Sequence, residues 1–264
     1  MITLWSITLR ATRYEALMAL RHKVLWLCLT PLGVLAMSLT LVAPTVVSQH
    51  DPVARMGTAI LAVNLIYTVG IGVALTDRLP QQHRAGLADL LAATPSGPTT
   101  YMAAALLGPL GIALVPVTVL LVLLGVGLSI SHNSLAPVGA AIIGVGAVIV
   151  PAALLTAALA TLLGLILPQV LARIIVIGLW FWSTAFSPSL FSGVPTPTDT
   201  LLSPLGGYLA AAVLHVNPSW ANGGAPGTLR PIANGASAIT NVALLFAVTL
   251  FFFGAARVVA ARRA

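Results

Sequence analysis

The sequence predicts an all-α integral membrane protein that forms a single transmembrane domain over residues 1–264. Hydrophobic residues make up 59% of the chain and charged residues 6%, and the mean hydropathy is +1.05. A soluble domain carries about 25% charged residues, so this composition cannot solvate a folded surface in water. A bilayer core needs roughly 20 helical residues to be crossed. Six apolar runs qualify as spans: residues 24–48, 57–76, 102–130, 138–167, 174–191 and 236–256.

The residues before the first run predict an amphipathic helix. At about 100° per residue, one group of apolar side chains falls within roughly 60° on a helix over residues 1–23, with arginines beside it. We expect this helix to lie in the membrane interface with its apolar face among the lipid headgroups, and a solvated tail is the alternative. The apolar group is Ile2, Trp5, Leu9, Ala16 and Leu20, and the arginines are Arg10, Arg13 and Arg21.

Two of the six runs are unusual. Run 24–48 follows Arg21 and Lys23 as a signal peptide would. It is longer than the roughly 7 to 15 residues of a signal-peptide core and has no small-residue cleavage site after it, so we expect it to remain as a span. Run 174–191 is the shortest and contains Ser187-Pro188. This predicts a helix that is tilted little or broken near its outer end.

The charges indicate the orientation. The chain has 12 Lys and Arg against 5 Asp and Glu, a net charge of +7, which in a soluble protein would suggest nucleic acid as a partner. Here the basic residues lie at the ends of apolar runs, and six spans place only Arg55 and Arg230 on one side. Cytoplasmic loops carry the excess of basic residues, so we expect a multi-pass protein of the cell membrane with both termini cytoplasmic and no nucleic-acid partner. The cytoplasmic group is Arg10, Arg13, Arg21, Lys23, Arg78, Arg84, Arg173, Arg257, Arg262 and Arg263.

The cytoplasmic loop between the second and third spans, residues 77–101, predicts a short helix with one apolar face. Leu87, Leu90, Leu91 and Thr94 recur at i, i+3, i+4 and i+7, and Pro95 cannot continue the helix. Such a face either lies on lipid or docks in a groove on a soluble partner. The residue pattern alone favours lipid.

The external connection between the fifth and sixth spans, residues 192–235, contains an apolar run of its own. Residues 205–216 are too few to span a bilayer, so they predict a re-entrant or interfacial segment. Ser203 is placed as an N-cap and Pro204 at the first helical position. Two functions are alternatives for this segment: a gate over an external exit, or a cap that packs on the helix ends.

Several kinds of chemistry are disfavoured. No Asp, Glu, Lys or Arg lies in the middle of a predicted span, as ion-coupled carriers usually need. A P-loop for ATP needs a lysine after its glycines, and Lys23 is the only lysine. Ser183 and its neighbours in the fifth span have no mid-span histidine as a base, which argues against an intramembrane protease. Cys28 is the single cysteine, so a disulfide framework is excluded, and the histidines lack metal-ligand spacing.

Five side chains within the spans are candidates for lining a path for an amphipathic cargo. They are Asn64 and Tyr67 in the second span and Trp180, Trp182 and Phe186 in the fifth. Ordinary interface anchoring is the alternative for the aromatic residues.

One stretch of local sequence carries a family resemblance. Residues 84–108 read RAGLADLLAATPSGPTTYMAAALLG, with Gly86, the leucine pair Leu90 and Leu91, and then Thr94-Pro95 shortly before the third span. Together with the amphipathic N-terminal helix, the six spans and the re-entrant external run, this pattern resembles the type-2 permease subunits of ATP-binding-cassette (ABC) exporters. The resemblance covers nearly the whole chain in topology and about 12 residues in motif.

This resemblance implies a function. Residues 84–95 would be the coupling helix that docks on a separate ATPase subunit, so this chain would have no catalytic site or cofactor of its own, with ATP and Mg²⁺ on the partner. A second permease copy or a paralogue would complete the exporter, and the uncharged spans favour an amphipathic or hydrophobic cargo such as a drug, a peptide antibiotic or a lipid-like molecule. The alternatives are export of a lipid-linked glycan and a non-transporting anchor or sensor for a cytoplasmic partner. The docking residues would be Arg84, Gly86, Leu87, Asp89, Leu90, Leu91, Thr94 and Pro95.

Overall fold

A computed structural model describes residues 4–21, 23–80, 98–186, 196–216 and 229–262. Its regular elements confirm the all-α fold class. They are α1 (Leu4–Arg21), α2 (Lys23–Val42), α3 (Pro44–Val47), α4 (Pro52–Leu75), α7 (Pro98–His132), α8 (Ala136–Gly144), the π-helical turn η1 (Val145–Ile149), α9 (Val150–Ile166), α10 (Gln169–Thr184), α11 (Gly207–Val213) and α12 (Gly235–Ala261).

The described part of the chain contains five helices that are long and apolar enough to cross a membrane, which makes this a multi-pass membrane protein. They are Leu25–Val42, Pro52–Pro80, Thr99–His132, Ala136–Ile166 and Gly235–Ala261.

The fifth of the six predicted spans differs from the expectation. Its helix, α10, has 16 residues, fewer than the roughly 20 that a bilayer core needs. The helix begins at Gln169 instead of residue 174 and has ended before Ser187-Pro188, which fits the expected break in this region. Residues 187–195 lie outside the described residues, and the loop 192–235 is described only for 196–216 and from 229 onward.

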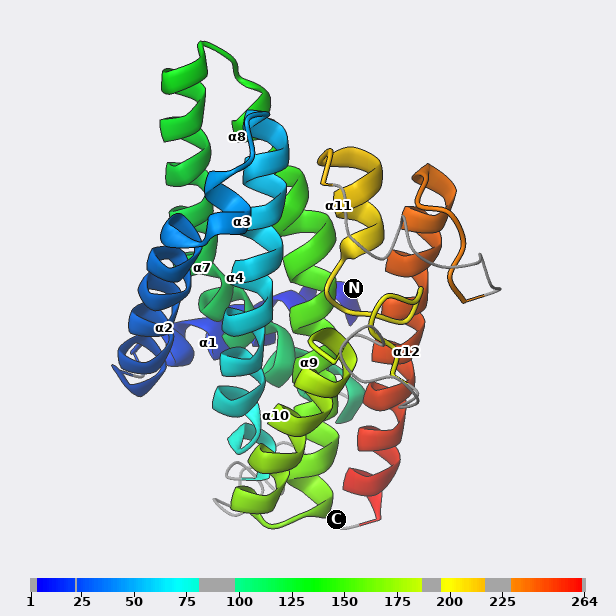
Figure 1. Ribbon diagram of the computed structural model, residues 1–264. Helices are drawn as coiled ribbons and strands as arrows, with labels where there is room; N and C mark the ends of the chain where they lie inside the picture. The colour runs from blue at the N-terminus through cyan, green and yellow to red at the C-terminus, as the bar shows by residue number, and fades with distance from the viewer. Residues whose placement is uncertain (1–3, 22, 81–97, 187–195, 217–228, 263–264) are drawn as a thin grey trace.

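The long helices run side by side, and α4 lies at their centre (Figure 1). We call the end with the α7–α8 turn the upper end and the end with the C-terminus of α12 the lower end. Helix α4 packs against α2, α7, α8, α9 and α10. Its side chains Ile60, Val63, Tyr67 and Ile71 are almost fully buried. In contrast, α12 packs mainly on α9 and α11 and leaves Ile239, Leu250 and Phe251 about 70% exposed, as expected for a lipid-facing side.

Helix α1 lies across the long helices instead of along them and packs on α7 (Figure 1). The crossing is close because α7 presents Gly108, where an added Cβ would lie 2.7 Å from the Cβ of Glu15 and 2.8 Å from the backbone nitrogen of Ala16. The helix expected over residues 1–23 is therefore present. Its exposed side carries arginines together with apolar residues, and its interfacial position stays a prediction. These side chains are Leu9, Arg10, Arg13, Tyr14, Leu17, Leu20 and Arg21.

Two of the predicted spans contain interruptions that hydropathy does not reveal. Run 24–48 breaks at Ala43, which is extended (φ −65°, ψ 124°), because the ring of Pro44 disfavours the α conformation in the residue before it. Run 138–167 contains the π-helical turn η1 directly before Pro151. Proline has no amide hydrogen to donate to the carbonyl four residues earlier, and π-turns accommodate such gaps.

The external run 205–216 forms a shorter helix than expected. Helix α11 begins at Gly207, and its N-cap is Gly206, with a left-handed φ of +84°. The expected N-cap at Ser203 is wrong. Its hydroxyl instead donates to the carbonyl oxygen of Ser183 (3.2 Å) and accepts from the Leu205 amide (3.4 Å).

Candidate functional site

The most unusual feature of the molecule is irregular backbone inside the bundle. Residues 196–206, here called the buried segment, lie at mid-height beside α12 (Figure 1). Helix α10 rises to this level from the lower end, and α11 continues from the buried segment toward the upper end. Between α10 and α11, the described backbone therefore includes the irregular residues 196–206. Most side chains of the buried segment are less than 9% exposed, among them Thr196, Thr198, Thr200, Leu201 and Ser203.

Two asparagines from different spans hold the backbone of the buried segment. The Nδ2 of Asn64 on α4 donates to the carbonyl oxygens of Pro204 (3.1 Å) and Leu205 (3.2 Å). The Nδ2 of Asn241 on α12 donates to those of Leu201 (2.7 Å) and Ser203 (3.1 Å). Asn64 is 0% and Asn241 1% exposed. Two amide groups therefore satisfy four carbonyl groups that no helix or strand partner serves.

The depth of these asparagines explains why such bonds are needed. Asn64 is the thirteenth residue of α4 and so lies about 18 Å along a helix of 24 residues. At this depth no lipid group can accept or donate a hydrogen bond, and each unsatisfied backbone carbonyl costs several kcal/mol. Irregular backbone is tolerated there only if the protein itself supplies the partners. Asn64 and Asn241 are such partners.

Hydroxyl groups join the buried segment to the end of α10. The last carbonyl groups of a helix have no partner within the helix. Thr198 Oγ1 donates to the carbonyl of Trp182 (3.1 Å), and Thr196 Oγ1 donates to that of Phe186 (2.7 Å). On the other side of α10, the indole Nε1 of Trp180 donates to the carbonyl of Leu65 on α4 (2.8 Å). Helix α10, α4 and the buried segment thus form one hydrogen-bonded unit.

Glycines allow the same segment and α11 to pack closely. An added Cβ on Gly206 would lie 2.5 Å from Cγ1 of Val148 in the π-turn η1. An added Cβ on Gly57 of α4 would lie 2.7 Å from the Cβ of Leu214 and 2.6 Å from Cγ2 of Val216. Small side chains allow helix backbones to approach closely in membrane proteins. Both ends of α11 are fixed in this way.

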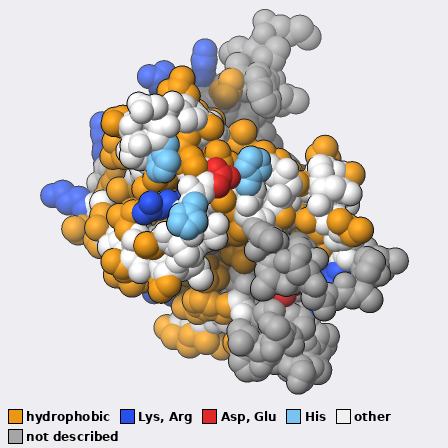
Figure 2. Space-filling view, turned by 45° about the horizontal axis from the view of Figure 1, so that its top comes forward, with side chains coloured by type: hydrophobic (Ala, Val, Ile, Leu, Met, Phe, Trp, Pro, Cys, Tyr) orange, Lys and Arg blue, Asp and Glu red, His pale blue; other side chains and the backbone are white. Residues whose placement is uncertain are grey.

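A hydrogen bond between two side chains closes the contact at the upper end. Asp51 is the N-cap of α4 and accepts from the Val53 amide (3.1 Å), while its other oxygen lies 3.0 Å from Nδ1 of His215, just after α11. Desolvation raises the pKa of Asp51, but the hydrogen bonds from His215 and from the Val53 and Ala54 amides outweigh it and leave the pKa below its usual range. Figure 2 shows histidine side chains gathered around an acidic group on this face.

Charged side chains connect three elements at the lower end. Arg78, just after α4, forms an ion pair with Glu15 of α1 (3.4 Å), whose side chain is 6% exposed. The neighbouring Asp77 accepts hydrogen bonds from Arg173 and Gln169, both at the start of α10. These pairs lie directly before residues 81–97 in the sequence. They tie α1 and α10 to the end of α4.

The structure places the predicted residues in three groups. The proposed docking residues lie outside the described residues: Arg84, Gly86, Leu87, Asp89, Leu90, Leu91, Thr94 and Pro95. The side chain of Asn64 and the backbone carbonyls of Trp182 and Phe186 are hydrogen-bonded to the buried segment, whereas the indole of Trp180 donates to Leu65 on α4. Tyr67 lies elsewhere, because its hydroxyl donates to the carbonyl of Ala113 on α7 (2.6 Å). The path assignment for these five residues stays a prediction.

Other residues of this site were not singled out from the sequence. Asn241 gives the same signal as Asn64, an amide within an apolar run, and could have been found. Glu15 is the single acidic residue in the N-terminal helix, which was also a usable signal. By contrast, nothing in the sequence indicates that Ser203 contacts Ser183 or that Asp77 contacts Arg173, because those contacts depend on how α10 packs.

Comparisons with known proteins do not identify the chain: no family model, no curated protein and no solved structure matches it. Within the described ranges there is also no group of three or more His, Cys, Asp or Glu side chains that could hold a metal ion. The site is therefore defined by its geometry. It consists of an uncharged, hydrogen-bonded segment of irregular backbone at mid-depth and of ion pairs at the lower end.

Proposed function

We propose that this chain is the membrane-spanning permease subunit of an ATP-driven ABC exporter. A separate ATPase subunit binds ATP and Mg²⁺, and a second permease copy or a paralogue completes the cargo path. The observation that carries the proposal is the irregular, buried backbone between α10 and α11, and we interpret α10, the buried segment and α11 together as one interrupted crossing. A protein that only anchors a partner gains nothing from irregular backbone at mid-depth, whereas interrupted helices are a common way for transporters to build sites and moving parts.

The lower-end ion pairs support a mechanical role for the loop 77–101. A force applied to this loop acts first on Asp77 and Arg78. Asp77 passes it to α10 through Arg173, and Arg78 passes it to α1 through Glu15. Helix α10 is bonded in turn to α4 at Leu65 and to the buried segment at Ser203. Movement at the lower end would thereby reach mid-depth without a charged residue in the lipid core.

This arrangement suggests how ATP would drive export. The coupling helix at residues 84–95 sits on the ATPase subunit, and nucleotide binding changes the contacts that this helix makes. Each nucleotide state must contact the inward-open and outward-open forms differently, since only a differential contact can shift their populations. The buried segment then changes its packing between α4 and α12 and opens or closes the path toward the upper end.

The cargo is proposed to be amphipathic or hydrophobic. The buried segment and its partners carry amide, hydroxyl and indole groups, and the larger side chains near them, Trp182 and Phe186, are 41% and 37% exposed. Such surfaces suit a molecule with a large apolar area and a few hydrogen-bonding groups better than a free ion. A drug, a peptide antibiotic or a lipid-like molecule meets this description, and a lipid-linked glycan is the runner-up.

Co-purification followed by ATPase assays tests the proposal. The tagged chain is expressed with the ATPase encoded beside it, and we expect the two to purify together from detergent. Leu90→Arg and Leu91→Arg should each abolish permease-stimulated ATP hydrolysis, because a charge would enter the apolar docking face. The matched control is Leu135→Arg, an exposed leucine in the α7–α8 turn at the upper end, which should leave stimulation unchanged.

The outcomes separate the alternatives. If the ATPase is never recovered, or if both coupling-helix variants stimulate it normally, the proposal fails. Recovery of the ATPase without ATP-dependent movement of any amphipathic cargo in reconstituted vesicles would instead indicate an anchor or sensor. Transport confined to a lipid-linked glycan would support the runner-up cargo.

A further inference from the structure

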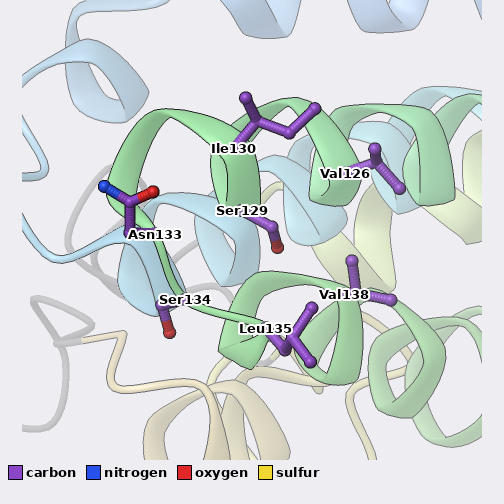
Figure 3. Close-up of a pocket in the computed structure, with 7 residues that line it drawn as sticks. All are labelled: Val126, Ser129, Ile130, Asn133, Ser134, Leu135 and Val138. Carbon is purple, nitrogen blue, oxygen red and sulfur yellow. The ribbon is translucent and has the colours of Figure 1, made fainter.

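A groove with a volume of about 410 Å³ lies between the end of α7 and the start of α8, at the upper end of the bundle (Figure 3). Its walls are mostly apolar. Val126 and Ile130 line it from α7, and Leu135 and Val138 line it from the other side. No charged side chain lines the groove, so a ligand here is recognised by its apolar surface and by neutral hydrogen-bonding groups.

The apolar walls continue the lipid-facing surface of the two spans. Exposed side chains follow one face of α7 at intervals of three or four residues and lead into the groove, and Leu135 and Ile142 do the same on the facing wall. A hydrocarbon chain lying along these spans would therefore enter the groove without leaving an apolar surface. The exposed residues on α7 are Val115, Val119, Leu123, Val126 and Ile130.

One polar group in the groove has no partner. Ser129 is 8% exposed, and its hydroxyl makes no hydrogen bond with any described residue. Several buried threonines in the helices donate to the carbonyl four residues earlier, as Thr156 does to Ala152 (2.8 Å). Figure 3 shows the Ser129 side chain pointing from α7 into the space that faces Leu135 and Val138. A buried hydroxyl without a partner is destabilising, and an acceptor from a ligand would remove this penalty.

We infer that this groove binds a membrane phospholipid, with an acyl chain along the apolar walls and an ester carbonyl oxygen accepting a hydrogen bond from Ser129. The depth fits: Ser129 lies three residues before the end of α7 at His132, about 5 Å below the helix end. The ester groups of a phospholipid lie just below its headgroup. Asn133 and Ser134 at the rim then face the headgroup region.

The inference does not depend on the proposed export function, because the lipid contacts belong to the transmembrane fold itself. The test uses the full chain in detergent with native mass spectrometry and two probe lipids. One is a diester phosphatidylcholine, and the other is the diether lipid with the same chains, which lacks the carbonyl oxygens. We expect the diester lipid to be retained about fivefold more strongly, the factor typical of one net hydrogen bond.

Two serines on the same helix provide a matched pair of variants. Ser129→Ala should remove the preference for the diester lipid while the protein stays folded. Ser131→Ala should keep the preference, because the exposed Ser131 hydroxyl already donates to the carbonyl of Leu128 (3.0 Å). Val138→Trp, which fills the groove, should weaken retention of both lipids.

Three results would overturn the inference. Equal retention of diester and diether lipid by the unaltered chain would show that no ester carbonyl is bound in the groove. An unchanged preference for the diester lipid in Ser129→Ala would show that this hydroxyl does not bind the lipid. Full retention of both lipids by a folded Val138→Trp chain would show that the lipid binds elsewhere.

Discussion

At the scale of single residues, the two buried asparagines are the most consequential side chains in the molecule. Each serves two backbone carbonyls of the buried segment through one amide nitrogen. They differ in the hydrogen bonds of their side-chain oxygens. The Oδ1 of Asn64 accepts from Thr68 (2.6 Å), whereas the Oδ1 of Asn241 has no partner among the described residues. Asn64 is thus part of a closed polar group, while Asn241 retains an unused acceptor.

We predict that Asn64→Leu and Asn241→Leu each lower the free energy of unfolding by about 2–6 kcal/mol. Leucine is close to asparagine in size, so the main loss is the two stranded carbonyl groups, at about 1–3 kcal/mol each. Denaturant unfolding in detergent, followed by tryptophan fluorescence, measures the change. Thr240→Leu is the control, because Thr240 is exposed beside Asn241 and bonds only within its own helix. A loss in the control equal to that of the asparagine variants would contradict the argument.

Asp51 gives a prediction about pH. Its lowered pKa means that folding favours the ionised carboxylate, so the stabilisation is full above the ordinary value of 3.8 and is lost as the pH falls through the lowered pKa. Asp51→Asn keeps an oxygen to cap α4 but removes the charge, and it should lose this acid dependence. Asp51→Ala also removes the cap and should cost about 1 kcal/mol at neutral pH. Thermal unfolding from about pH 6 to about pH 3 measures both effects, and identical acid slopes in all three proteins would refute them.

At the scale of elements, hydropathy locates the helices well and their interruptions poorly. The predicted run 57–76 matches α4, which begins at Pro52 and ends at Leu75, and the run 236–256 lies within α12, which continues to Ala261. Hydropathy averages over many residues, so it passes over single positions at which the backbone changes. Ala43 and the π-turn before Pro151 are such positions, although Pro44 and Pro151 are visible in the sequence. The proline signals were available and would have improved the boundaries.

Many contacts of the candidate site could not be predicted from the sequence, and the reason here is different. Asn64 stood out as an amide in an apolar run, but its bonds to Pro204 and Leu205 join residues 140 and 141 positions apart. The left-handed Gly206 and its contact with Val148 depend on the same packing. Sequence periodicity describes one element at a time. A contact between the buried segment and two spans becomes visible only when the elements are assembled.

The contact of α11 with the π-turn yields a prediction for this element. Gly206→Ala should destabilise the chain by at least roughly 1–2 kcal/mol, because a left-handed conformation is unfavourable for alanine and the new Cβ would lie 2.5 Å from Val148. Gly178→Ala in α10 is the matched control. Its Cβ would meet no atom within 4 Å, and alanine is the better helix former. We therefore expect a neutral or stabilising effect there, and a Gly206→Ala chain as stable as this control would show that α11 is not fixed at Gly206.

At the scale of the whole molecule, charge and shape agree on one arrangement. The ion pairs of Arg78 and Arg173 lie at the lower end with the end of α12, whereas the pair of Asp51 and His215 lies at the upper end. Helix α10 alone is too short to cross a bilayer. If α10, the buried segment and α11 together form one interrupted crossing, as we propose, the chain crosses six times and both termini lie on the side that carries most of the arginines.

This topology gives the last prediction, which cysteine labelling in intact cells can test. Cys28 is the only cysteine, so Cys28→Ser provides a cysteine-free background. Single cysteines are then placed at Ser48 and at Ala236 in the first turn of α12, both exposed at the upper end, and at Arg262, exposed at the lower end. If the arginine-rich side is cytoplasmic, a membrane-impermeant maleimide should label the first two in intact cells and Arg262→Cys only after permeabilisation. Labelling of Ser48→Cys but not Ala236→Cys would mean that the interrupted crossing does not cross. The reverse pattern at all three positions would place the termini outside and remove the basis for docking a cytoplasmic ATPase on residues 84–95.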